Sequence, residues 1–312
     1  MEADNGIYTI DTGFKRAHFD AAYLVVEDGR GAFVDTGTHH SVPRLLAALG
    51  EAGLRVQDVD WVILTHVHLD HAGGAGELIR QLPNARLAVH PRGARHMVDP
   101  GRLWAGATAV YGEETMKADY GIATPVDPAR VVEAGDGECL ALAGRELTCF
   151  DTPGHARHHI CIWDERSRSF FTGDTFGLSY RELDTDRGPF ALPTTTPVQF
   201  DPDALHASID RLLASRPQGM YLTHYGRVED LARMADDLHR SIDAMVEVAL
   251  AHADEPDPHA GIVEDLGALY AQDLAAHGVA GGREAACSLL GDDIELNAQG
   301  LVVWLGQRRH RG

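Results

Sequence analysis

Six consecutive positions hold three histidines and one aspartate, within the stretch THVHLDHAGG at residues 65–74. Histidine nitrogens and carboxylate oxygens are ligands for zinc and other borderline divalent ions. Because alternate side chains of an extended chain share a face, His66, His68 and Asp70 are expected to project in the same direction, with His71 following as the chain turns. A single ion does not need all four side chains. The stretch therefore predicts metal binding and leaves the number of ions open.

Three further candidate ligands follow short apolar runs elsewhere in the chain. They are His155 in DTPGHARHH, Asp174 in FTGDTF and His224 in YLTHYG. Functional side chains gather at the loops that follow strands, so these three are expected near the first four. Seven ligands divide into two sites of three, with one carboxylate shared, and the sequence thus favours a two-ion centre.

Two more aspartates, Asp35 in VDTG and Asp151 in FDTPGH, also end predicted strands. Each is expected either to orient a ligand imidazole through a hydrogen bond or to form a strand-end turn, and both interpretations stay open.

The histidine pairs at 39–40 and 158–159 are expected to line the rim of the site or to make local hydrogen bonds. Seven ligands already fill two sites, so these pairs are not needed as ligands.

The segments that carry these residues alternate between strand and helix, which indicates an α/β fold. A hairpin is expected around EDGRG, and helices and strands follow it in turn. The expected elements are the hairpin 22–35, helix 43–53, strand 59–64, helix 75–82, strand 85–90, strands within 131–173, helix 201–215 and strand 219–226. Residues 97–130 carry aromatic side chains on a weakly helical background and are predicted to form a helical lid.

The last part of the chain is predicted to be helical. Apolar residues recur at steps of three or four between 231 and 248. This stripe is expected to pack against the rest of the domain or against a second copy in a homodimer. A linker is expected at 253–261, with two or three more helices after it.

Composition limits the classes of function. The 312 residues are 44% hydrophobic and 24% charged, which is typical of a globular protein. The sequence has no run of about 18 apolar residues, so no membrane span is predicted. The start, MEADNGIYTIDTG, has neither the basic nor the apolar region of a secretory signal, so we expect a cytoplasmic protein. A net charge of −20 disfavours nucleic acid as a partner. The four cysteines fit neither CxxC pairs nor a disulfide framework, and are expected to be reduced and mostly buried.

Taken together, the motifs resemble those of the metallo-β-lactamase superfamily. The pattern His-x-His-x-Asp-His, a lone His in TPGH, an Asp in TGDT and a late His after an apolar strand occur in the family's order within residues 7–226. The resemblance implies a four-layer αββα sandwich with the site along one edge of its two sheets. The ligands that it implies are His66, His68 and His155 for the first ion, Asp70, His71 and His224 for the second, and Asp174 as a bridge.

The resemblance further implies a metallo-β-lactamase-fold hydrolase domain over residues 1–240 and a helical C-terminal extension over 241–312. Two divalent ions are expected as cofactors, with zinc first and iron or manganese as alternatives. Such a pair can hold a bridging water and lower its pKa from about 15.7 to near 7, which supplies a hydroxide nucleophile. Asp70 is the expected catalytic residue, placed to orient the nucleophile or to pass a proton to the leaving group.

Three groups of relatives differ in their substrates. True β-lactamases are exported and often carry a cysteine in the second site, and neither feature is found here. Glyoxalase II-like thioesterases share the seven ligands, but their glutathione pocket depends on basic C-terminal helices, whereas residues 240–312 are acidic until QRRHRG. N-acyl homoserine lactonases place a tyrosine three residues after the bridging aspartate, where this chain has Gly177, and Tyr180 or Tyr225 is the expected substitute.

We therefore expect a lactonase-, esterase- or phosphotriesterase-like enzyme that cleaves a lactone, carboxyl ester or phosphoester bond. A small, weakly charged substrate fits the acidic surface. The aromatic residues expected to contact it, unless they are packed under the insert, are Phe176, Tyr180, Tyr225, Trp104 and Tyr111. Two alternatives stay open: a glyoxalase II-like thioesterase, and a mononuclear iron persulfide dioxygenase-like oxidoreductase in which Asp70 and His71 bind no metal.

Overall fold

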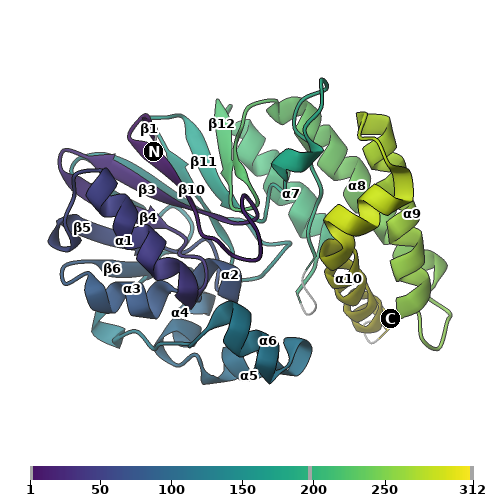
Figure 1. Ribbon diagram of the computed structural model, residues 1–312, viewed down its shortest axis with the longest axis horizontal. Helices are drawn as coiled ribbons and strands as arrows, with labels where there is room; N and C mark the ends of the chain where they lie inside the picture. The colour runs from purple at the N-terminus through teal and green to yellow at the C-terminus, as the bar shows by residue number, and fades with distance from the viewer. Residues whose placement is uncertain (1–2, 196–198, 310–312) are drawn as a thin grey trace. The chain divides into compact units, whose positions relative to one another are not determined.

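The computed structural model describes residues 3–195 and 199–309, which form two compact units (Figure 1). Unit 1 comprises Met1–Asp151, His158–Gly173 and Pro217–Arg227. Unit 2 comprises Thr152–Arg157, Asp174–Arg216 and Val228–Gly312. The expected domain boundary after residue 240 falls inside a helix of unit 2 and stays a prediction.

Unit 1 holds two mixed β-sheets. The first has its seven strands in sequence order, antiparallel from β1 to β4 and parallel from β4 to β7. They are β1 Ala3–Asp4, β2 Ile7–Asp11, β3 Ala21–Glu27, β4 Arg30–Val34, β5 Val59–Ile63, β6 Arg86–Val89 and β7 Val131–Glu133. The predicted hairpin and the predicted strands at 59–64 and 85–90 are therefore confirmed.

The second sheet has the order β13-β12-β11-β10-β9-β8, with β11 and β12 parallel to each other. Its strands are β8 Cys139–Leu142, β9 Arg145–Asp151, β10 Ile160–Asp164, β11 Ser169–Gly173, β12 Gly219–Leu222 and β13 Gly226–Val228. The strands expected within 131–173 and at 219–226 are confirmed.

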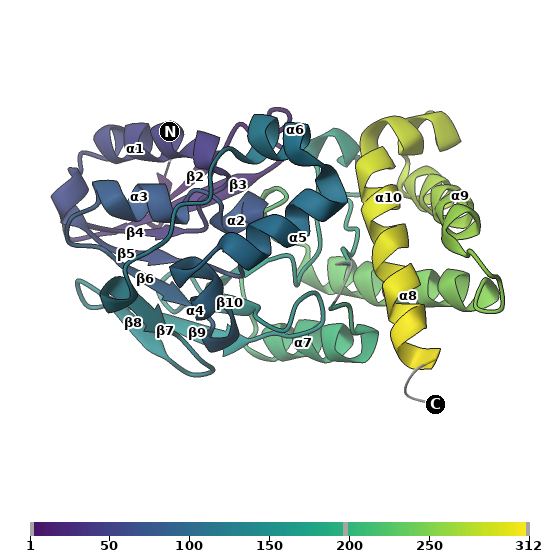
Figure 2. The ribbon, with the colours of Figure 1, turned by 90° about the horizontal axis from the view of Figure 1, so that it is seen from below.

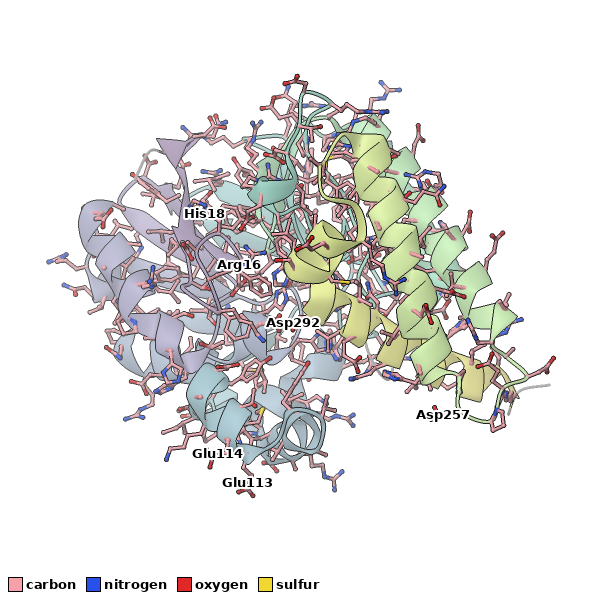
Figure 3. The ribbon with its side chains drawn as sticks, turned by 45° about the vertical axis from the view of Figure 1, so that its right-hand side comes forward. Arg16, His18, Glu113, Glu114, Asp257 and Asp292 are labelled. Atoms are coloured by element: carbon pink, nitrogen blue, oxygen red, sulfur yellow. The ribbon has the colours of Figure 1, made fainter. Side chains whose placement is uncertain are left out.

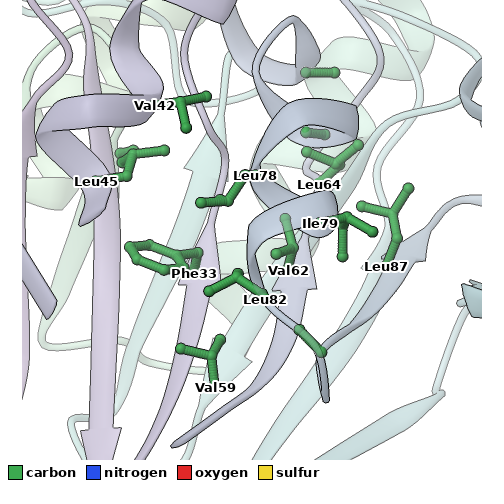
Figure 4. Close-up of a cluster of buried hydrophobic side chains, with 14 of the residues drawn as sticks. Phe33, Val42, Leu45, Val59, Val62, Leu64, Leu78, Ile79, Leu82 and Leu87 are labelled. Atoms are coloured by element: carbon green, nitrogen blue, oxygen red, sulfur yellow. The ribbon is translucent and has the colours of Figure 1, made fainter. Parts of the chain in front are cut away.

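Helices cover one face of the first sheet, and the second sheet covers the other. On the helical side Leu45 and Leu78 pack over Phe33 and Val62, all of them fully buried (Figure 4). This is the expected result for the amphipathic segments at 43–53 and 75–82, which form α1 Val42–Glu51 and α3 Ala75–Gln81. Between the sheets a second apolar cluster includes Tyr23, Ile63, Ile162 and Phe171.

The segment predicted as a helical lid, 97–130, is helical over most of 101–120, whereas 121–127 contain no helix. Figure 2 shows its main helix, α5 Gly101–Tyr111, which follows α4 Pro91–Val98; α6 Glu113–Thr115 and a π-helical turn at Met116–Tyr120 come next. Figure 3 labels Glu113 and Glu114 on α6, and Arg16 and His18 on the loop between β2 and β3. The expected role as a lid stays a prediction.

Unit 2 contains the long helices α7 Pro202–Ala214, α8 Leu231–Ala251, α9 His259–His277 and α10 Gly282–Arg309. Asp201 caps α7 as predicted, because its Oδ1 accepts a hydrogen bond from Ala204 N at 3.2 Å. The stripe on α8 is buried within the chain, where Met245 Sδ accepts from the Tyr270 hydroxyl of α9. Pairing of two copies stays a prediction.

The structure also bears on the predicted absence of a membrane span and on the predicted burial of the cysteines. Of the helices described between residues 3 and 309, none combines the length and apolarity that a bilayer span requires. The cysteines were expected to be mostly buried, but only Cys149 and Cys161 are, while Cys139 and Cys287 are exposed. Cys139 lies on β8, whose alternate residues face away from the core, and Cys287 lies on an outer face of α10.

Candidate metal centre

The histidine motif begins at the end of β5, beside the end of the parallel strand β4. Asp35 follows β4 and adopts a left-handed conformation with φ 55°. Its Oδ1 accepts a hydrogen bond from Thr65 N at 2.8 Å, and its side chain is almost completely buried. This hydrogen bond links the ends of β4 and β5, and it therefore fixes the position at which the turn after Thr65 begins.

His66 and His68 lie side by side in unit 1. His66 Nε2 is 2.7 Å from His68 Nδ1, and His66 Nδ1 is 3.2 Å from Thr65 Oγ1. His66 is fully buried and its ring stacks on His159 with centroids 4.9 Å apart. The expected common direction of these two side chains is therefore confirmed.

Asp70 belongs to a different group of side chains, contrary to the expectation from an extended chain. The helix α2 Leu69–Ala72 starts directly after His68, so the two-residue alternation ends there. Asp70 Oδ2 instead lies 3.7 Å from His71 Nε2 and 3.5 Å from His224 Nε2. These three residues offer one ligand atom each, all within 4.8 Å of one another.

In the second group, the other ring nitrogen of each histidine is held by unit 1. His71 Nδ1 donates to Asp35 Oδ2 at 3.0 Å, and His224 Nδ1 donates to the backbone oxygen of Phe19 at 2.9 Å. Each hydrogen bond fixes the proton on Nδ1 and leaves Nε2 as the basic nitrogen that faces Asp70. Asp35 therefore orients the imidazole of His71 through a hydrogen bond, and the prediction that His71 binds a metal ion stays a prediction.

Unit 2 contains a third group of the same kind. His155 Nε2 lies 3.2 Å from Asp174 Oδ2, and Thr194 Oγ1 lies 2.8 Å from His155 Nδ1. The turn that carries His155 needs Gly154, whose φ is 131° and where a Cβ atom would meet the Leu205 backbone at 2.4 Å. Both side chains are buried.

The donor chemistry of these groups fits divalent metal ions. His71, His224 and His155 each have Nδ1 held by an oxygen and Nε2 turned to a carboxylate. Metal-binding histidines in proteins have this arrangement, in which a hydrogen bond to one ring nitrogen orients the other toward the ion. Imidazole and carboxylate ligands suit zinc, iron and manganese.

Residues 17–224 match the sequence profile of the Metallo-beta-lactamase superfamily. The chain belongs to this superfamily. The match covers strands β3 to β12 and all seven expected ligands, and the predicted family and its α/β fold are confirmed. Members of the superfamily are mostly metal-dependent hydrolases, and the histidine and aspartate groups above are consistent with metal binding.

Individual relatives in the superfamily are distant. Metallo-beta-lactamase fold-containing protein ST1585 of Sulfurisphaera tokodaii is 28% identical over 72% of this chain and 79% of its own length. Its solved structure gives a TM-score of 0.67 at 22% identity, with 96% of this chain and 99% of that chain covered. Acyl-coenzyme A thioesterase MBLAC2 of Gallus gallus is 29% identical over 54% of this chain, and hydroxyacylglutathione hydrolase of Salmonella typhi is 27% identical over 49%. The chain spans 62% and 45% of the lengths of these two thioesterases.

One carboxyl group near the superfamily ligands has no counterpart in the sequence expectations. Asp20 is fully buried before β3 and accepts a hydrogen bond from Thr12 Oγ1 at 2.8 Å. Burial raises the pKa of Asp20 to about 7, although the charges of His224 and His71 lower it. No motif marks this residue; its only signal in the sequence is its place directly before the apolar run AAYLVV.

The paired histidines and Asp151 make contacts of their own. His158 and His159 are buried, and both rings stack on His66, with centroids 6.2 and 4.9 Å away; the predicted place at the rim of the site stays a prediction. Asp151 Oδ1 lies 3.2 Å from His90 Nε2. His40 Nε2 lies 3.4 Å from the backbone oxygen of Lys117, which is a local hydrogen bond of the predicted type.

The five aromatic residues expected at the substrate differ in their surroundings. Trp104 packs against an apolar cluster of unit 1, Tyr111 is partly exposed and contacts Tyr120, and Tyr225 contacts the ring of His18. Phe176 and Tyr180 are buried, and the Tyr180 hydroxyl donates to Asp293 at 3.2 Å. Contact of these side chains with a substrate stays a prediction.

Proposed function

We propose that this protein is a dinuclear metal-dependent hydrolase of lactone, carboxyl ester or phosphoester bonds. The observation that carries the proposal is the shared orientation of His71, His224 and His155. Each has a held Nδ1 and an Nε2 directed at a carboxylate, so three imidazoles are prepared to bind cations. If these histidines served only to make hydrogen bonds, there would be no reason for Nε2 to face a carboxylate in all three.

The proposed ligands follow the order of the superfamily motif. Two divalent ions, zinc in the first instance, would supply Lewis-acid polarisation of the scissile group and a water with a pKa lowered toward 7. The proposed sets are His66, His68 and His155 for the first ion and Asp70, His71 and His224 for the second, with Asp174 shared. Iron or manganese would suit the same donors.

Asp70 is the proposed catalytic residue of this chain. Its side chain is 25% exposed, compared with 0% for His71 and 7% for His224. Asp70 is therefore the ligand in its group that a substrate or a water molecule reaches most easily. In this role its carboxylate orients the attacking water and moves a proton to the leaving group.

The surroundings of His224 support a small, weakly charged substrate. The ring of Phe19 lies 5.5 Å from the ring of His224, and Phe19 packs against the cluster of Phe14, Met116 and Tyr120. An apolar wall beside the ligands favours uncharged alkyl or acyl groups. The net charge of −20 disfavours polyanionic substrates.

Thioesters are a second candidate class, which the relatives favour. The two thioesterases reported above are similar to this chain over about half of its length. Thioester cleavage uses the same ligands and differs in the leaving group, so a substrate panel separates the two. The mononuclear iron alternative is less consistent with the second group, because three donors there already lie within 4.8 Å of one another.

The test is hydrolysis of a panel of lactones, aryl esters, phosphotriesters and acyl thioesters by zinc-loaded and chelator-treated protein. We expect turnover of at least one class, its loss on chelation and its recovery with zinc. His68→Ala should lower the rate more than about 100-fold, because it removes a proposed ligand. His96→Ala on α4 is the matched control and should leave the rate unchanged. Full activity of His68→Ala would refute the ligand assignment.

A further inference from the structure

Helices α7 and α8 of unit 2 carry two facing pairs of histidine and aspartate. His206 and Asp210 lie four residues apart on α7, and His239 and Asp243 lie four residues apart on α8. This spacing places each pair on one face of its helix. The two imidazole rings are nearly parallel, with an interplanar angle of 16° and centroids 4.9 Å apart.

Each histidine is held by the aspartate of the opposite helix. His206 Nε2 lies 3.1 Å from Asp243 Oδ1, and His239 Nε2 lies 3.1 Å from Asp210 Oδ1. The two inner nitrogens face each other, with His206 Nδ1 only 2.6 Å from His239 Nδ1. The order across the helix pair is therefore carboxylate, imidazole, imidazole, carboxylate.

The short contact between the two Nδ1 atoms needs either a hydrogen or a metal ion between them. Two nitrogen lone pairs would repel each other at 2.6 Å, so one proton must lie between the Nδ1 atoms. The negative charges of the two outer carboxylates favour a cation between the imidazoles. A divalent ion in place of the hydrogen increases that attraction, and a carboxylate behind each imidazole makes the ring a stronger ligand.

We propose that His206 Nδ1 and His239 Nδ1 bind a divalent transition-metal ion such as Zn²⁺, with water in the remaining coordination positions. Binding releases the shared proton to solvent. Two nitrogens at 2.0–2.1 Å from a tetrahedral ion lie about 3.4 Å apart, so the rings must separate by less than about 1 Å. The side chains are 25% and 26% exposed, which gives the ion access from solvent.

The site goes beyond the proposed hydrolase function and uses none of its ligands. It does join the two helices next to the turn that carries His155. Ser208 Oγ of α7 donates to Pro153 O at 2.6 Å, and Asp201 N donates to Gly154 O at 2.8 Å. An ion between α7 and α8 therefore holds in place the helix on which that turn rests.

The test uses full-length protein loaded with zinc and freed of excess metal, which is then titrated with Zn²⁺ by calorimetry. Bound zinc is counted by mass spectrometry after gel filtration. We expect the wild type to bind one more ion per chain than His206→Gln or His239→Gln. His259→Gln removes another surface histidine that faces a carboxylate, Glu295 at 3.0 Å, and should keep the additional ion. The proposed site would be overturned if both ligand variants bound the additional ion as the wild type does, or if the wild type bound no additional ion.

Two further variants keep the test decisive if a histidine variant does not fold. Asp210 and Asp243 are 71% and 73% exposed, so their replacement does not threaten the core. Asp210→Asn and Asp243→Asn retain both ligands and should lower the affinity for the additional ion by about 10- to 100-fold. Unchanged affinity in both would contradict the proposed arrangement.

Discussion

Replacing Asp35 with Asn changes which ring nitrogen of His71 carries the proton. In the native protein Asp35 Oδ2 accepts from His71 Nδ1, and Oδ1 accepts from Thr65 N. Asparagine keeps one oxygen for Thr65 and tolerates the left-handed backbone at this position, where φ is 55°. Its amide NH2 then faces His71 Nδ1 and must donate to it. The proton of His71 moves to Nε2, the atom proposed to bind the second ion.

The size of this effect follows from the loss of a buried carboxylate behind a metal ligand. Such losses reduce metal affinity by about 10- to 100-fold. That range corresponds to about 1.4–2.7 kcal/mol of binding free energy. We expect the upper part of the range, because Asp35 is 1% exposed and no water can replace its oxygen at His71. The ion assigned to His66, His68 and His155 should be affected less.

The assay is competition of zinc-loaded protein with a chelator, read as zinc retained per chain at each chelator concentration. Asp35→Asn should release the ion assigned to Asp70, His71 and His224 at a chelator concentration about 10- to 100-fold lower than the wild type requires, and the remaining ions near their native chelator concentrations. Asp60→Asn is the matched control, since Asp60 lies on β5 and binds Arg30 at the surface. Two unshifted release steps in Asp35→Asn would refute the reasoning.

Three smaller predictions concern other contacts. Thr194→Val removes the hydroxyl at His155 Nδ1 and should lower the affinity for one ion by about 10-fold in the same chelator assay. Gly154→Ala should lower the free energy of unfolding in urea by more than about 2 kcal/mol, because a Cβ there meets the α7 backbone. Hydrogen bonds to Asp265 and Glu255 raise the pKa of His252 above 6.5, so this histidine stabilises the fold fully below pH 6.5 and loses that contribution as pH rises through the raised pKa. His252→Gln should flatten this part of the urea stability profile against pH.

Much of the scaffold could be predicted because its signals are local. The apolar run at 59–64 became β5, and the proline and glycine that bound 43–53 mark α1 within two residues. Asp35 could be given an orienting role, with a strand-end turn as the alternative, because it follows a predicted strand. His66 and His68 could be paired because the chain is still extended between them.

Other features depend on contacts between distant segments, which no local pattern encodes. Asp70 does not project with His66 and His68 because α2 starts at Leu69. That short helix has no capping or periodic signal in the sequence. The backbone oxygen of Phe19 orients His224 across 205 positions of sequence. His206 and His239 each stand alone in a helical stretch, and only the packing of α7 on α8 brings their rings together.

The central claim is that this chain holds two divalent ions and uses them for hydrolysis. The most direct measurement is metal content per chain by mass spectrometry, with the rate on the best panel substrate followed in the same samples as ions are withdrawn. We predict two ions per chain besides the one proposed between His206 and His239, and a rate that falls as either of these two is removed and returns with zinc. One iron per chain, with no hydrolysis of lactones, esters, thioesters or phosphoesters, would contradict the claim.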